Sequence, residues 1–254
     1  MRHGLVKSNY IPNRDQRELR KITLYRQELI EERARELNRI QSVLEGANIK
    51  LGSIISDING KSGISILKAI ISGNTDPVSL SKLACGTARN KIPELQKALK
   101  GSVKDHQIIM LRHQLDHVEN LTKIISELDE DIQKKTKINL EQIQFIDEIP
   151  GIGVRSDERI LAETGVNMEQ FKNSDHFSSW AGLVPECIES AGKKMSTRIR
   201  KGNKYLKATL VECARSAIRK KDSYFYGKYQ QIAARRGGKR ALIAIAHISY
   251  FERT

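Results

Sequence analysis

Residues 108–132 read IIMLRHQLDHVENLTKIISELDEDI, and apolar side chains recur in this stretch at steps of three and four residues. These apolar positions are Ile108, Leu111, Leu115, Val118, Leu121, Ile125, Leu128 and Ile132. The spacing places them on one face of an α-helix and is typical of the contact face of an antiparallel helical hairpin or a coiled coil. We therefore expect a long helix from about Val103 to Thr136. The core of an ordinary helical bundle is the alternative explanation.

A second long helix is expected upstream, beginning after Pro12 and ending near residues 52–63, where turn-forming residues gather. Apolar residues recur in it mostly at helical spacings, namely Leu19, Ile22, Leu29, Ile40 and Leu44. The two helices should pair as a stalk, which is also the expected surface for a homo-oligomer. Residues 1–137 would then form a linker, the stalk and a small helical tip.

The helical tip is expected between Ile64 and about Ala98, where short helical segments are separated by turn residues. Either Ser79 or Ser81 could cap one short helix, since a hydroxyl oxygen can accept a hydrogen bond from a free backbone N–H. Pro93 should lie in the first turn of the next helix, where its missing N–H removes no hydrogen bond.

Residues 138–254 form the second expected domain, because they are punctuated by glycine and hold the excess positive charge. Sixteen Lys and Arg lie between Ala191 and Arg240, against only Glu212 and Asp222. This excess of +14 equals the formal net charge of the chain, and the other residues hold 28 basic and 28 acidic side chains. A confined basic segment is typical of a nucleic-acid-binding surface. No strand-rich region is evident, so the expected fold class is all-α.

Composition excludes several other classes of protein. No apolar run approaches the roughly 20 residues that a membrane span needs, and the N-terminus does not resemble a signal peptide. Cys85, Cys187 and Cys213 are far apart and odd in number, which predicts no disulfide framework and fits a reducing cytoplasm. His113 and His117 have the spacing of a helical metal pair but no evident third ligand, so no metal site is expected in this chain.

Residues 146–153 read IDEIPGIG, and a further helical segment, RILAETG, follows at 159–165. This pattern is similar to a helix-hairpin-helix, in which Gly151 and Gly153 allow a sharp turn and leave backbone N–H groups uncovered. Such groups at a helix N-terminus bind a phosphate without reading a base. A purely structural corner between two helices is the alternative.

Further candidate nucleic-acid-binding residues lie in the basic segment. They are Lys193, Lys194, Arg198, Arg200, Lys201, Asn203, Lys204, Arg235, Arg236, Lys239 and Arg240. Aromatic side chains are interleaved with lysines at residues 220–229, which favours stacking on bases or sugars. Packing between helices explains these aromatic residues equally well.

Five motifs in this half of the chain resemble a known family when they are taken in order. They are PGIG (150–153), SWAGLVP (179–185), SAGK (190–193), RKGNKYLK (200–207) and RGGKRALIAIAH (236–247). Their order is similar to that in the C-terminal domain of Piv-type bacterial insertion-sequence transposases, DEDD recombinases whose full-length members work with a bridge RNA. Residues 3–20 also resemble the segment that precedes the first long helix in this family. The resemblance therefore covers nearly the whole chain.

The resemblance implies that Ser190 is the nucleophile that attacks DNA, with Gly192 and Lys193 in register. It also implies a metal-binding RuvC-like domain, whose acidic residues are not found in this sequence. Magnesium is therefore expected only in that domain, and this chain is expected to hold no cofactor. Both ends of the chain look truncated relative to the family, and the isolated chain is expected to be inactive.

The expected function is that of the DNA-binding C-terminal portion of an insertion-sequence transposase, which contributes Ser190 to a composite site. DNA is the expected partner, a structured guide RNA is a further one, and the bacterial cytoplasm with its nucleoid is the expected location. The alternative is a non-enzymatic module that binds the DNA backbone and dimerises through the stalk.

Overall fold

The computed structural model describes residues 12–137, 153–167, 170–185, 188–190, 193–196, 199 and 201–251. These residues are mainly helical, which confirms the predicted all-α class, and they add one short two-stranded β-hairpin that the sequence did not reveal. The chain divides into two compact units, which we name the hairpin unit (Tyr25–Asp129) and the C-terminal unit (Met1–Leu24 with Glu130–Thr254). Within the described residues, no helix combines the length and apolarity that a membrane span requires.

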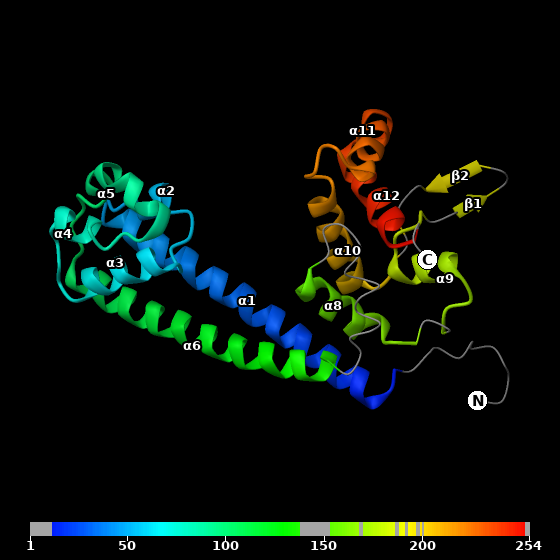
Figure 1. Ribbon diagram of the computed structural model, residues 1–254, viewed down its shortest axis with the longest axis horizontal. Coiled ribbons are helices and arrows are strands. Elements are labelled where there is room, and N and C mark those ends of the chain that lie inside the picture. Colours follow the sequence, from blue (N-terminus) through cyan, green and yellow to red (C-terminus); the bar gives the residue numbers. More distant parts are fainter. Residues whose placement is uncertain are drawn as a thin grey trace. The chain divides into compact units, whose positions relative to one another are not determined.

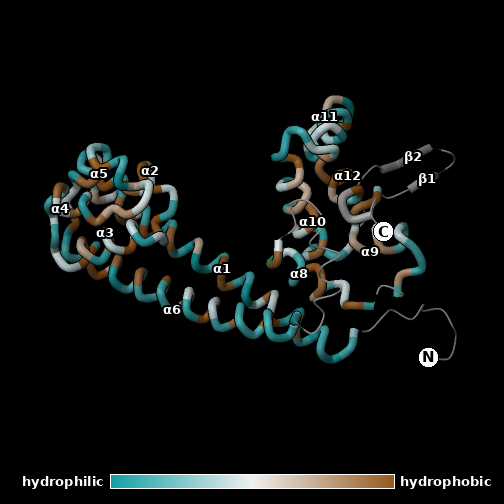
Figure 2. Tube along the Cα trace, in the orientation of Figure 1, coloured by the Kyte–Doolittle hydropathy of each residue, from teal (hydrophilic) through white to brown (hydrophobic). Residues whose placement is uncertain are grey.

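The two long helices are α1 (Arg14–Gly46) and α6 (Asp105–Thr136) (Figure 1). The bounds of α6 are close to the predicted ones, whereas α1 ends at Gly46, before the predicted end near residues 52–63. In the hairpin unit, Leu29 of α1 packs against Leu121 and Ile125 of α6. Nearer the tip, one buried cluster contains Ile40, Leu44, Leu111, Leu115 and Val118. Figure 2 shows both helices as mainly hydrophilic, with hydrophobic positions at intervals. The predicted apolar seam is therefore confirmed as an antiparallel contact within one chain.

Polar contacts flank this seam. Arg26 of α1 pairs with Asp129 of α6, and both side chains are largely shielded from solvent. Nη1 of Arg33 donates to Oγ1 of Thr122 at 3.3 Å. Because these pairs connect residues far apart in the sequence, they help to fix the register of the two helices.

The tip, residues 47–104, connects α1 to α6. Its elements are α2 (Leu51–Ile54), α3 (Lys61–Ile71), α4 (Pro77–Ser81), the 3-10 helix η1 (Gly86–Lys91) and α5 (Ile92–Ala98). The side chain of Asp76 caps α4 by accepting from the backbone N–H groups of residues 78 and 79. The predicted cap by Ser79 or Ser81 was wrong, since a carboxylate directly before Pro77 takes that position. Pro93 lies in the first turn of α5, as predicted.

The C-terminal unit contains the remaining elements. They are α8 (Val154–Thr164), α9 (Ser174–Ala181), β1 (Ile188–Ser190), β2 (Lys193–Ser196), α10 (Lys204–Ala217), α11 (Tyr224–Arg236) and α12 (Gly238–Phe251). Its main core joins α8, α9, α10 and α12 through Ile160, Phe177, Leu206, Leu210 and Ile245. Leu19 of α1 and Ile132 of α6 pack with Ala162 of α8 in a smaller cluster. The domain boundary near residue 137 remains a prediction.

Candidate nucleic-acid interface

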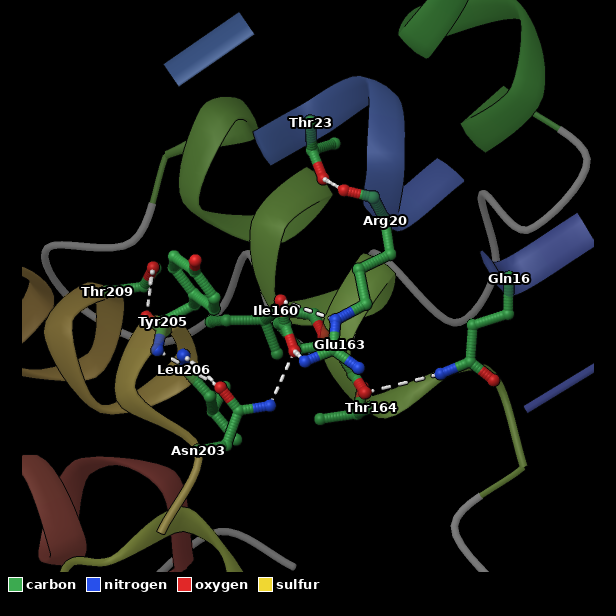
Figure 3. A network of polar contacts seen from close by, with 10 residues as sticks. All are labelled: Gln16, Arg20, Thr23, Ile160, Glu163, Thr164, Asn203, Tyr205, Leu206 and Thr209. Carbon is green, nitrogen blue, oxygen red and sulfur yellow. Dashed lines mark hydrogen bonds and ion pairs between the residues drawn. The ribbon is translucent and has the colours of Figure 1, made fainter. Parts of the chain in front are cut away.

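Glu163, in the last turn of α8, connects three segments that are far apart in the sequence (Figure 3). Its side chain is only 4% exposed, and Nη2 of Arg20 lies 2.9 Å from its Oε2. Nε of Arg20 donates to Oε1 at 3.1 Å, and Nδ2 of Asn203 donates to Oε2. A buried carboxylate is tolerated when its oxygens are paired in this way. Glu163 therefore fixes α1 and the loop before α10 onto α8.

Asn203 is held on both sides of its amide. While Nδ2 bonds to Glu163, Oδ1 accepts from the backbone N–H groups of Tyr205 at 3.0 Å and Leu206 at 3.1 Å. It is thus the N-cap of α10. The backbone N–H of Asn203 also donates to the carbonyl oxygen of Trp180 at 3.0 Å. The structure therefore places Asn203, predicted to bind nucleic acid, in the candidate interface, with its amide engaged in fixing the loop.

Gly202 brings the loop close to the end of α9. A Cβ on Gly202 would lie 2.3 Å from the backbone nitrogen of Gly182 and 2.6 Å from the carbonyl oxygen of Trp180. Gly182 itself ends α9 in the left-handed conformation, with φ of 71°. The motifs SWAGLVP and RKGNKYLK are therefore packed directly on each other by their glycines.

These contacts form the wall of an open depression of about 490 Å³ in the C-terminal unit. Its lining residues are Arg20, Ser179, Trp180, Lys201, Gly202, Asn203, Lys204 and Tyr205. Three of them are cations and two are aromatic residues. Trp180 and Tyr205 are each 38% exposed, and Nζ of Lys204 lies 4.7 Å from the centre of the Tyr205 ring. Cations beside accessible rings suit a ligand with phosphates and stacking bases.

Comparison with known families bears on this part of the chain. Residues 143–230 match the model of the Transposase IS116/IS110/IS902 family. The match supports a transposase C-terminal domain of the IS110 type. No curated protein matches the chain. The segment that matches the transposase family contains α8, both packed motifs and the loop that Glu163 fixes.

Ser190 lies within the same transposase-family segment, as the last residue of β1. β1 and β2 are antiparallel, and Ser190 pairs with Lys193 while Glu189 pairs with Lys194. The first and last residues of the SAGK motif, Ser190 and Lys193, thus face each other across the two strands, and Pro185 and Ile199 form a further antiparallel bridge. Arg198 and Arg200 lie outside the described residues.

The predicted helix-hairpin-helix is only partly within the described residues. Gly153 is exposed and is the N-cap residue of α8, with open space where a Cβ would stand. Gly151 and the preceding segment lie outside the described residues, so the motif stays a prediction. Asp157 and Glu158 of the first turns of α8 are buried. Their carboxylates are therefore shielded from the solvent near Gly153, and Oε2 of Glu158 accepts from Nη1 of Arg155 at 3.2 Å.

The last four predicted cations gather at a second place, the turn between α11 and α12. Arg235, Arg236, Lys239 and Arg240 are all exposed around Gly237, whose φ is 82°. They do not line the depression at Lys201. Two explanations were given for the aromatic residues of α11, stacking on bases and packing between helices. Phe225 and Tyr229 pack against the core, whereas Tyr224 is 56% exposed and its ring is accessible for stacking.

Sequence reasoning did not identify Arg20, Trp180 and Tyr205, which line the depression, or Glu163, which pairs with Arg20. Within the described residues, no group of three His, Cys, Asp or Glu is placed to hold a metal ion. In the hairpin unit, His117 lies 3.1 Å from Oε1 of Glu32.

Proposed function

We propose that the chain is the DNA-binding C-terminal portion of an insertion-sequence transposase, and that the depression at Lys201 contacts DNA. The transposase-family match supports a role in transposition. The observation that carries the proposal is the convergence of Arg20, Lys201, Lys204, Trp180 and Tyr205 around a loop that Glu163 and Asn203 hold in place.

The chemistry of the depression suits a distorted or partly unstacked DNA strand. Lys201 and Lys204 can neutralise backbone phosphates and release their counterions, whereas the charge of Arg20 is already paired with Glu163. Trp180 and Tyr205 offer ring faces for an unstacked base or sugar. Because hydrogen bonds already fix the loop, little conformational entropy is lost when DNA binds.

Ser190 is the nucleophile in this proposal, and the resemblance of the SAGK motif to the family supports the assignment. Its Oγ would lose a proton, form a bond to phosphorus and displace a deoxyribose oxygen, which would take up a proton. The reaction involves no change of oxidation state. A RuvC-like domain would supply magnesium to this composite site and stabilise the charge that develops on phosphate. A guide RNA and a location at the bacterial nucleoid belong to the same proposal.

We extend the proposal to a homo-oligomer held by the stalk. The α1–α6 seam is occupied within one chain, so contacts between copies would use outer apolar side chains. Tyr25, Ile109 and Met110 are 49%, 55% and 45% exposed. Replacing Ile109 and Met110 with Asp should lower the sedimentation coefficient of the oligomer to that of a monomer. An unchanged value would exclude these residues from the interface.

The DNA contact is tested by titrating a labelled duplex against salt concentration. The Lys201→Gln/Lys204→Gln variant should weaken binding and reduce the log–log salt slope by about 2, because two phosphate contacts are lost. Lys123→Gln/Lys134→Gln is the matched control, since it removes the same charge from exposed positions on α6. Equal slopes for the two variants would contradict the proposed contact. DNA binding without a covalent adduct, even when a RuvC-like domain is supplied in cis, would favour the non-enzymatic alternative.

A further inference from the structure

The tip of the hairpin unit, residues 47–104, carries a local positive charge that the whole-chain count hides. It holds nine Lys and Arg against Asp57, Asp76 and Glu94. Residues 138–190 hold three basic and ten acidic residues. Basic and acidic residues are equal in number outside the segment from Ala191 to Arg240 largely because the basic tip offsets the acidic residues 138–190.

Most of this charge on the tip is not neutralised by ion pairs. Nζ of Lys68 lies 2.7 Å from Glu119 of α6, and the other eight cations have no ion pair within the described part of the chain. Two of the three acids are used in local turns. Asp76 caps α4, and Oδ1 of Asp57 accepts from the backbone N–H of Asn59 at 2.9 Å. The cations therefore remain available to an external anion.

One group of cations is brought together at the C-terminal end of α5. The backbone N–H of Lys50 donates to the carbonyl oxygen of Ala98 at 2.9 Å. This bond places the residue before α2 beside Lys97 and Lys100, which flank Ala98 in the sequence. All three lysines are exposed.

Two further cations lie at the other end of α2. Nζ of Lys91 donates to the carbonyl oxygen of Ile54 at 3.2 Å. Lys61 and Lys91 both line an open depression of about 310 Å³ between α2, α3 and η1, which Asp57 also borders. No side chain caps the first turn of α3, so its N–H groups add partial positive charge there.

The composition of the tip indicates which nucleic acid would suit this surface. Residues 47–104 contain no Phe, Tyr or Trp, in contrast to the depression with Trp180 and Tyr205. Single strands are usually bound by stacking their bases on aromatic rings. Lysines without such rings can contact a backbone whose bases stay paired and stacked.

We propose that the tip face, formed by Lys50, Lys61, Lys91, Lys97 and Lys100, binds the phosphate backbone of duplex DNA. This contact is separate from the depression at Lys201 and does not depend on it. It reads no base, so it is tolerant of sequence. With five cations, it contributes about 4 to 5 to the log–log salt slope, since each neutralised phosphate of a duplex contributes about 0.9.

The test is the salt titration of the full chain with a long DNA duplex of mixed sequence. Lys61→Gln/Lys91→Gln should lower the slope by about 2 and the affinity about tenfold or more at moderate salt. Lys123→Gln/Lys134→Gln on α6 removes equal charge outside the tip and should change the slope little. The Lys61 side chain makes no hydrogen bond within the described residues, so Lys61→Gln alone should lower the slope by about 1 without disturbing the fold there.

Two further experiments distinguish DNA binding by the tip face from binding at the depression and from binding of other nucleic acids. The same titration with Lys201→Gln/Lys204→Gln reports on the depression, so either contact can fail while the other stands. Single-stranded DNA and an RNA hairpin serve as alternative probes, and the tip variant should bind single strands as the α6 control does. If the tip variant matches the control on duplex DNA, or loses affinity chiefly for the RNA hairpin, the proposal is wrong.

Discussion

Gly202 lies so close to Gly182 that a Cβ on Gly202 would stand 2.3 Å from the Gly182 backbone nitrogen. The neighbouring atoms belong to the backbone, so no side chain can rotate away to make room. This contact seats the loop before α10 on the end of α9. The positions of Lys201 and Lys204 therefore depend on a residue that has no side chain of its own.

Gly202→Ala should destabilise the C-terminal unit. The added methyl group must push apart two backbone segments, and overpacking of this kind costs about 1–3 kcal/mol. Urea unfolding measures the loss. Gly227→Ala in α11 is the matched control, because open space surrounds its Cβ position and alanine favours a helix. Equal stability of the two variants would show that the loop moves freely away from α9.

Removing the charge of Glu163 should also destabilise the C-terminal unit. In Glu163→Gln, Arg20 loses its carboxylate partner and one oxygen acceptor becomes a donor facing Asn203. Because Arg20 is partly exposed to solvent, we expect a loss of about 1–3 kcal/mol in the free energy of unfolding. Glu212→Gln is the control, since its side chain is 64% exposed and pairs with Arg159 only at 3.4 Å. That change should alter stability by less than about 0.5 kcal/mol.

The α1–α6 seam can be tested by burying a charge in it. Leu115→Asp places a carboxylate in a position that is 4% exposed, without a partner, and should destabilise the hairpin unit by several kcal/mol, on the order of 3–5. Circular dichroism should show a lower melting temperature. Asn120→Asp adds the same charge at an exposed position of α6 and should have little effect. Unchanged melting in Leu115→Asp would mean that the seam is not packed in solution.

Burial raises the pKa of the Cys213 thiol, and the carboxylates of Asp157 and Glu212 raise it further, against a hydrogen bond with Ser156 that lowers it. As pH rises above about 8.5, the unfolded thiol therefore ionises before the folded one. The unfolded state gains by losing its proton, so the stability that Cys213 contributes falls as pH rises toward its raised pKa. The midpoint of urea unfolding should decrease more between neutral and alkaline pH in the wild-type chain than in Cys213→Ala.

The same environment predicts slow reaction of Cys213 with a thiol reagent. Cys85 is exposed, whereas Cys213 is buried in the core of the C-terminal unit. In a Cys85→Ser/Cys187→Ser variant, the remaining thiol should be labelled only after denaturant is added. Rapid labelling of the native variant would indicate that α10 opens readily.

The long helices could be predicted from the sequence because the spacing of apolar residues that marks a helix lies within one short stretch of the chain. Leu111, Leu115 and Val118 repeat at a helical spacing, and this period alone identifies the face that becomes buried. Likewise, Pro93 marks the start of α5 through its own covalent geometry. The cap by Asp76 was missed because several residues near α4 offer a suitable oxygen and only the backbone direction selects one.

The depression at Lys201 could be predicted only in part. The cations at Lys201 and Lys204 were evident from charge, and Asn203 from its motif. Arg20 and Glu163 could not be recognised, since 143 residues separate the two partners and nothing local marks them as a pair. The β-hairpin at Ser190 was missed because three- and four-residue strands carry too short an alternation to distinguish from a loop.

The assignment of Ser190 can be tested by covalent capture of labelled DNA on a denaturing gel. Since the proposal places the metal in a RuvC-like domain, this chain alone should form no adduct in the presence of magnesium. Supplying such a domain in cis should restore capture, and Ser190→Ala should then abolish it while duplex binding is retained. Ser179→Ala, at a serine that lines the depression, is the control and should still form the adduct. An adduct with the chain alone would make it an enzyme in its own right. An adduct that still forms in Ser190→Ala of the restored protein would show that another residue is the nucleophile. If Ser179→Ala abolishes the adduct and Ser190→Ala does not, the reaction takes place in the depression at Lys201.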